Sequence, residues 1–186
     1  MFFILVIVLV ALIVLATGGS LANLKNCRFK FPWLVIIAAC LKIISISNIL
    51  VFSDYYASYF RIASLILVIL FLVFNFSLRG MPLIALGFAC NAAVIMLNGG
   101  NMPVAAEYAE LVATGADLQK LLAGLPVDSF ILTSAGTKLT FLGDIFKMPD
   151  WVPVSKLFSI GDVFATIGGI VFVVYYLKFS NNKKYK

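Results

Sequence analysis

Residues Phe141 to Gly169, FLGDIFKMPDWVPVSKLFSIGDVFATIGG, repeat one short pattern and then enter a long apolar run. The first copy is Leu-Gly-Asp-Ile-Phe around Asp144, and the second is Ile-Gly-Asp-Val-Phe around Asp162. The chain holds only 8 acidic residues in 186, so two carboxylates with the same kind of apolar neighbours are the first candidates for chemistry. The second copy lies where a predicted helix begins.

The composition indicates an integral membrane protein. Hydrophobic residues make up 63% of the chain, charged residues 12%, and the mean hydropathy is +1.09. A run of about 20 apolar residues is enough to span a bilayer, and several such runs are present. The net charge of +6 lies in short loops and at the C-terminus, so we expect no nucleic-acid partner.

The chain contains no histidine, which limits the chemistry that it can carry out. A Ser-His-Asp or Cys-His nucleophile and a histidine-ligated metal site are both excluded. We expect no metal and no cofactor.

The apolar runs predict an all-α fold with five transmembrane helices in a single membrane domain. The predicted spans are about 2–17, 32–51, 59–76, 82–97 and 159–177. Proline and glycine at their ends agree with these bounds, because Pro suits the first helical turn and Gly a helix stop.

The basic residues predict the orientation of these helices. Lys and Arg gather in segments 20–30 and 77–80 and in the tail 178–186, which the positive-inside rule places in the cytoplasm. The N-terminus is then outside, the C-terminus inside, and segment 98–156 is extracytoplasmic. In this count Arg61 is one of the outer charges, near the start of the third span.

The extracytoplasmic segment predicts some structure of its own. Val104–Leu122 shows helical periodicity and predicts an amphipathic helix on the membrane or over the bundle. Phe130–Thr133 and Lys138–Phe141 are β-like runs that predict a short hairpin. Asp54–Tyr59, which precedes the third helix, predicts an aromatic turn at the outer interface.

Asp144 and Asp162 predict an acid/base pair. Two carboxylates that share a water repel each other, so one can act as the base and the other as the acid. The alternative for Asp162 is structural, because Ser159-Ile160-Gly161-Asp162 resembles a capping box and an acidic residue in the first turn also suits the helix dipole. Both interpretations remain open at this point.

The turn Asn98-Gly99-Gly100-Asn101 predicts a substrate-binding loop, because glycines allow close approach to backbone N–H groups and two carboxamides. A simple helix stop accounts for it equally well.

Lys42, near the middle of the second span, is an intramembrane ionisable group and hence a functional candidate. The structural alternative is that Lys42 snorkels to the interface or has a polar partner, such as Asn91 within the fourth span. Ser45, Ser47 and Asn48 would also ease its burial.

The last motif, Phe158-Ser-Ile-Gly-Asp-Val-Phe-Ala-Thr-Ile-Gly168, resembles the final catalytic motif of lipoprotein (type II) signal peptidases, Phe-Asn-x-Ala-Asp-x-x-Ile-x-x-Gly. That family cleaves lipid-modified signal peptides with two aspartates at the outer membrane surface and without a metal. The resemblance covers about 25 residues. Here Ser159 and Gly161 replace its Asn and Ala. The family's upstream motif, Gly-Asn-x-x-Asp-Arg, is loosely echoed by Gly143-Asp144, and Lys147 stands where strict spacing would place the second aspartate of the catalytic pair.

The whole chain also resembles an uncharacterised group of small bacterial multi-pass membrane proteins with Asn-Gly-Gly-x-Met-Pro, Leu-Gly-Asp and Ser-Ile-Gly-Asp signatures. This second resemblance implies a location in the bacterial inner membrane and no particular activity.

The leading functional hypothesis is a membrane-embedded aspartyl hydrolase, similar to lipoprotein signal peptidases, that acts on a membrane-anchored peptide or lipoprotein. The alternative is a non-enzymatic membrane subunit or binding protein, with a partner chain possible. A small transporter is third, because five helices without an internal repeat offer little for alternating access.

The predicted orientation is testable with fused reporters. A reporter that is active only outside the cytoplasm is expected to work after Gln119 and to fail after Lys184, because the basic loops hold the C-terminus inside. Activity measured in intact cells distinguishes the two fusions. The reverse pattern would contradict the orientation and the outer-surface site.

Overall fold

The structure is a computed structural model that describes residues 2–46, 54–149, 152 and 157–179. Its long apolar helices are α1 (Phe2–Ala16), α2 (Trp33–Ile46), α3 (Asp54–Phe74), α4 (Met81–Leu97) and α7 (Ile160–Val174). Within the described residues, the helical segments Tyr56–Phe74 and Ile160–Phe179 are long and apolar enough to cross a membrane. The other three helices are equally apolar in character but shorter.

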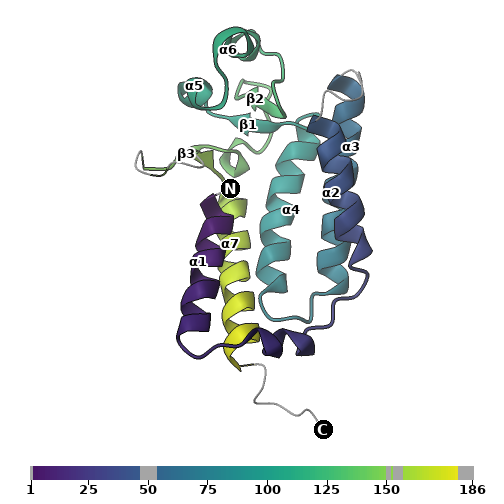
Figure 1. Ribbon diagram of the computed structural model, residues 1–186. Helices are drawn as coiled ribbons and strands as arrows, with labels where there is room; N and C mark the ends of the chain where they lie inside the picture. Colours follow the sequence, from purple (N-terminus) through teal and green to yellow (C-terminus); the bar gives the residue numbers. More distant parts are fainter. Residues whose placement is uncertain (1, 47–53, 150–151, 153–156, 180–186) are drawn as a thin grey trace.

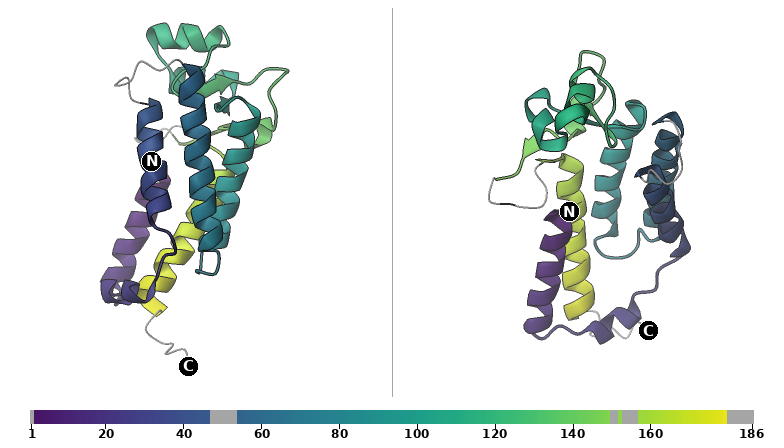
Figure 2. Two further views of the ribbon diagram at one scale, coloured as in Figure 1. Left: turned by 90° about the vertical axis from the view of Figure 1, so that its right-hand side faces the viewer. Right: turned by 45° about the horizontal axis from the view of Figure 1, so that its top comes forward.

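The helices pack as a row in the order α1, α7, α4, α3, α2. Figure 1 and Figure 2 show α1 beside α7 and α2 beside α3, with α4 between these two pairs. Both ends of the row contribute side chains to one cavity, so the row curves around that cavity. This curvature brings polar side chains from distant parts of the chain together.

Glycines set the contact between α4 and α7. Gly87 of α4 lies against Gly161 of α7, and Gly80, just before α4, lies against Gly168. A Cβ at Gly87 would lie 2.6 Å from the backbone nitrogen of Ala165, and one at Gly168 would lie 2.7 Å from the backbone oxygen of Gly80. The two antiparallel helices therefore pack backbone against backbone, as small residues permit in membrane bundles.

Buried asparagines close the end of the bundle opposite the strands. Asn75 is 2% exposed, accepts a hydrogen bond from the Lys30 backbone N–H at 2.8 Å and donates to the Lys30 carbonyl at 2.9 Å. Asn23, in the 3₁₀ helix η1 (Leu21–Asn26), donates to the Leu177 carbonyl at 2.8 Å. Leu177 lies in the π-helical turn η4 (Tyr175–Phe179) that follows α7. These bonds satisfy backbone groups at helix ends.

A small α/β segment covers the other end of the bundle (Figure 1). Strand β1 (Met102–Val104) pairs in parallel with β2 (Phe130–Leu132), and β3 (Phe146–Lys147) pairs antiparallel with β4 (Leu157–Phe158). The helices of this segment are η2 (Ala106–Tyr108), α5 (Ala109–Val112), α6 (Gly115–Leu122) and η3 (Thr140–Leu142). Its own core consists of Ala109, Ala113, Leu121 and Val127.

The single amphipathic helix predicted over Val104–Leu122 was wrong. The chain forms the end of β1 and then η2, α5 and α6, with extended backbone at Ala113 and Thr114 between the last two helices. Gly115, the first residue of α6, has a φ of 57°, a left-handed conformation that glycine adopts readily, so α5 and α6 cannot form one continuous helix. The polar face survives only in α6, where Lys120 pairs with Asp117 at 2.8 Å.

The predicted hairpin between Phe130–Thr133 and Lys138–Phe141 was also wrong. Phe130–Leu132 pairs with β1 instead, and Thr140–Leu142 is a 3₁₀ helix. The Asn98 carboxamide binds both backbone groups of Lys138, at 2.9 and 3.0 Å, so that Lys138 has neither group free for a strand partner. Leu139 has a φ of 51°, which a strand does not allow.

The predicted aromatic turn at Asp54–Tyr59 is the first part of α3, which corrects the start of that helix. No glycine or proline occurs between Asp54 and Phe74, so nothing in this stretch breaks the helix. The predicted end of the second helix, 47–51, lies outside the described residues, as does the tail beyond Phe179.

The glycine contact predicts the effect of adding one methyl group. Gly87→Ala is expected to destabilise the protein by about 1–3 kcal/mol, because the new Cβ meets backbone atoms that cannot move independently. Gly136→Ala is the matched control, since no atom lies within 4 Å of its Cβ. Thermal unfolding in detergent is the measurement, and equal midpoints for the two variants would contradict a tight α4–α7 contact.

Candidate functional site

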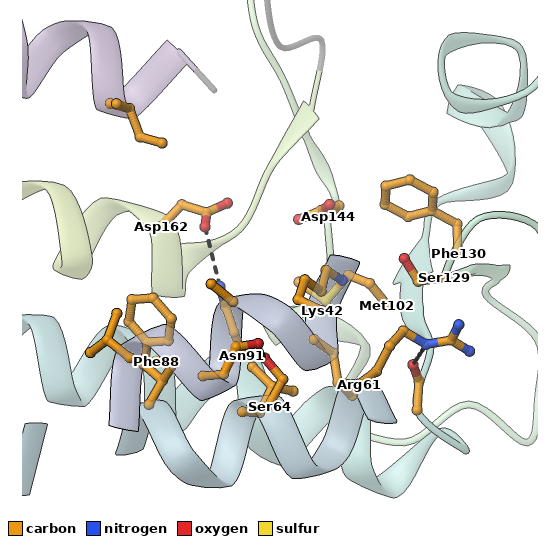
Figure 3. A pocket seen from close by; sticks show the side chains of 18 residues that line it. Lys42, Arg61, Ser64, Phe88, Asn91, Met102, Ser129, Phe130, Asp144 and Asp162 are labelled. Atoms are coloured by element: carbon orange, nitrogen blue, oxygen red, sulfur yellow. Dashed lines mark hydrogen bonds between the residues drawn. The ribbon is translucent and has the colours of Figure 1, made fainter. Parts of the chain in front are cut away.

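A cavity of about 730 Å³ lies between the helix row and the small α/β segment. Its walls are mostly apolar, and side chains from α1, α2, α3, α4 and α7 line it together with residues of β1 and β2. The charged and amide side chains that line it are those of Lys42, Arg61, Asn91, Asp144 and Asp162 (Figure 3). An apolar cavity with a few convergent polar groups is the usual form of a small-molecule site.

Asp144 is held at the cavity by β1. Its backbone N–H donates to the Pro103 carbonyl at 2.9 Å, and it forms a parallel bridge with Val104. Gly143 allows this approach, because a Cβ there would lie 2.6 Å from the Pro103 oxygen. Asp144 Oδ1 is buried and has no hydrogen-bond partner among the described residues. Burial, together with the charge of Asp162, raises the pKa of Asp144 from 3.8 to about 7.

Asp162 is held at the cavity by the start of α7 and by α4. The capping box predicted from the sequence is confirmed: Ser159 Oγ accepts from the Asp162 N–H at 3.2 Å, and the Ser159 N–H donates to Asp162 Oδ2 at 3.1 Å. Asn91 of α4 adds a third bond, from Nδ2 to Asp162 Oδ1 at 3.2 Å (Figure 3). Both carboxylate oxygens of Asp162 therefore accept hydrogen bonds.

Asn91 links the two helices through its other atom as well. Ser159 Oγ donates to Asn91 Oδ1 at 3.0 Å, and Ser159 is fully buried. The expected pairing of Asn91 with Lys42 is thus replaced by pairing with Asp162 and Ser159. Lys42 lines the same cavity, and its amine has no hydrogen-bond or ion-pair partner among the residues that the structure describes.

The predicted substrate loop divides between two roles. Asn98 binds the backbone of Lys138, as described above, and Asn101 Oδ1 accepts from Arg61 at 2.9 Å. Gly99 has a φ of 66° and shapes the turn. Within this turn only Gly100 lines the cavity. The loop therefore acts on the site mainly by holding Arg61, which lines the cavity.

Arg61 is the site residue that sequence reasoning missed. It is 7% exposed on α3, and its Nε donates to the Gly100 carbonyl at 2.9 Å while its terminal NH2 group donates to Asn101. Counting it as an outer charge treated it as a topology signal only. The sequence did contain a reason to select Arg61: it lies inside a predicted span, where an ionisable residue is by default a candidate for function.

The two carboxylates occupy different environments in one cavity. Asp144 has an unpartnered buried oxygen and a raised pKa, whereas Asp162 accepts hydrogen bonds from Asn91 and Ser159. When two carboxyl groups in one cavity have surroundings as different as these, one can act as the acid and the other as the base. Within the described ranges no cluster of three or more Cys, Asp or Glu residues could hold a metal ion.

The chain belongs to a protein family of unknown function, DUF5317, which matches residues 26–174. It is also similar to an uncharacterized protein of Thermotoga maritima, with 26% identity over 168 residues that cover 89% of this chain and 87% of that protein. No solved structure matches the chain. The range matched by the family contains every charged and amide residue that lines the cavity, from Lys42 to Asp162.

The raised pKa of Asp144 predicts how stability depends on pH. Below pH 3.8 the Asp144 carboxyl group is protonated in both the folded and the unfolded state, so its contribution to the stability of the folded state is at its maximum. Between pH 3.8 and about 7 the unfolded group ionises first, so stability falls as the pH rises, by a few kcal/mol at most, and then levels off.

Asp144→Asn is expected to flatten this part of the curve, because asparagine keeps the shape and does not titrate. Thermal unfolding in detergent micelles between pH 4 and pH 8 is the measurement. The exposed, ion-paired Asp117 offers a control, Asp117→Asn, which should keep the slope of the parent protein. The same slope in Asp144→Asn and in the parent would contradict the raised pKa.

Proposed function

We propose that this protein is a membrane-embedded aspartyl hydrolase in which Asp144 and Asp162 act as a pair. The observation that carries the proposal is that both carboxylates line one cavity, and that Asp144 has a pKa near 7 and a buried oxygen without a hydrogen-bond partner among the described residues. A carboxyl group with a pKa near the working pH can donate a proton and take it back.

The proposed reaction is the hydrolysis of an amide bond. Asp162 takes a proton from a water molecule whose oxygen attacks the carbonyl carbon, and Asp144 donates a proton to the leaving nitrogen as the C–N bond breaks. Water is thereby added across the bond, and the next proton transfers restore the two groups. Asn91 and Ser159 orient Asp162 for this role.

The membrane placement is part of the proposal. The five apolar helices are taken to cross the inner membrane of a bacterium, with the N-terminus outside, the C-terminus inside and segment 98–156 extracytoplasmic. Large apolar side chains on the outer faces of the row support this placement: Leu9 is 58% exposed, Ile36 65% and Val73 56%. Large apolar side chains are thus exposed on α1, α2 and α3, and a bilayer would remove them from water.

The shorter helices fit a membrane only with adjustment. A helix of 14 or 15 residues, such as α2 or α1, is roughly 21–23 Å long, below the roughly 30 Å of the hydrocarbon core. Local thinning of the bilayer accommodates such a mismatch at modest cost.

The resemblance of the last motif to lipoprotein signal peptidases supports the same class of reaction. It suggests a membrane-anchored peptide or lipoprotein as the substrate. The two replacements in the motif have structural roles here, because Ser159 caps α7 and Gly161 allows Asn91 to approach.

A non-enzymatic binding role is the second candidate, and one observation favours it. Both oxygens of Asp162 are already used, by the capping box and by Asn91, which would also be the arrangement of a purely structural carboxylate. In this case the cavity would bind a ligand or a partner without changing it.

Asparagine substitutions separate the two candidates. Asp144→Asn and Asp162→Asn should each abolish hydrolysis, with the double variant little worse than either single variant, because the two groups act as one unit. Asparagine is nearly as good as aspartate at helix caps, and at position 144 it keeps the shape of the side chain, so both variants should fold. The measurement is the cleavage of lipid-linked fluorogenic peptides by the purified full-length protein in micelles.

Asp117→Asn is the control, because the Asp117 side chain is exposed on α6 and does not line the cavity. This variant should hydrolyse the peptide at the rate of the parent protein. Full activity in a folded Asp162→Asn variant would refute the hydrolase and leave the binding role.

A further inference from the structure

Lys42 is a cation that lines the cavity beside apolar residues of α2 and has no side-chain partner among the residues that the structure describes. Among the described residues its amine makes no hydrogen bond and no ion pair, and Arg61, from the neighbouring helix α3, lines the same cavity. Val35, Ala38 and Ala39 line it beside Lys42 on α2. An ionisable amine among such residues is unfavourable unless an anion reaches it.

The cavity is bounded on one side by the two ends of the helix row. Ile4 of α1 and Val35 of α2 both line it, although α1 packs on α7 and α2 packs on α3. Figure 1 shows these two helices on either side of α4. In the membrane placement proposed above, the side between α1 and α2 faces lipid chains, so an apolar chain can enter there while its headgroup lies among polar residues.

We propose that the cavity binds a membrane amphiphile with an anionic headgroup, whose chain lies between α1 and α2 and whose anion pairs with Lys42. This inference rests on the proposed function for its membrane placement and names the class of lipid that the same cavity binds. A phosphate diester or a carboxylate carried on an acyl chain has the required chemistry.

The charges in the cavity favour an anion over a neutral or zwitterionic ligand. Lys42 and Arg61 are cationic, and Asp162 supplies one carboxylate that already accepts hydrogen bonds from Asn91 and Ser159. Asp144 is largely protonated below pH 7 because of its raised pKa. A neutral headgroup would leave Lys42 without a partner, and a small soluble anion would leave the apolar walls Ile4, Val68 and Phe88 unfilled.

Direct binding tests the inference without requiring any hydrolysis. Purified full-length protein in a nonionic detergent is titrated with two fluorescent lipids of equal chain length, one a phosphatidylglycerol and the other a diacylglycerol, which has no phosphate and no charge. The anionic probe is expected to bind about tenfold more tightly, the effect of one added charge pair. Lys42→Met should remove this preference, and Lys42→Arg should keep it.

Lys138→Met is the matched control, because Lys138 is exposed and does not line the cavity. It should keep the full preference for the anionic probe. The inference is overturned by equal binding of the two probes to the parent protein, by an unchanged preference in Lys42→Met, or by displacement of the probe with inorganic phosphate alone. Asp144→Asn separates the two proposals, since it should abolish hydrolysis and leave the headgroup preference in place.

Discussion

The backbone contact between α4 and α7 is the constraint on which the rest of the structure depends. Gly87 against Gly161 and Gly80 against Gly168 allow the two helices to approach more closely than any side chain would permit. This approach brings Asn91 within hydrogen-bond distance of Asp162 and Ser159. Helix α4 lies at the centre of the row, with α7 and α1 on one side of it and α3 and α2 on the other.

The charged groups of the site come from parts of the chain that have no local relation to each other. Asp162 is fixed by its own helix start and by α4, and Asp144 by a strand that begins right after α4. Lys42 and Arg61 come from the helix pair on the far side of the cavity. The two carboxylates of the proposed reaction and the two cations of the proposed anion site therefore lie on different walls of one cavity, so that each proposal can be tested without the other.

Local patterns in the sequence predicted the parts that depend on neighbouring residues. The apolar runs predicted the helices, and Ser159 three residues before Asp162 predicted the capping box, because a cap involves atoms within one helical turn. The same reasoning failed for Val104–Leu122 and for the hairpin. There the parallel pairing of β1 with β2 and the capture of Lys138 by Asn98 override the local preference.

The sequence by itself determined the apolar helices, the exclusion of histidine chemistry and the choice of Asp144 and Asp162 as candidate residues. Only the tertiary structure decided that Asn91 donates a hydrogen bond to Asp162 and that Arg61 lines the cavity. It also decided that the Lys42 side chain has no partner within the described part of the chain. The reason is physical: helix periodicity and capping act over about four residues, whereas contacts between distant segments depend on close packing. Gly87 and Gly161 permit this close packing because they have no side chain. The residues around each glycine do not indicate which helix will pack against it.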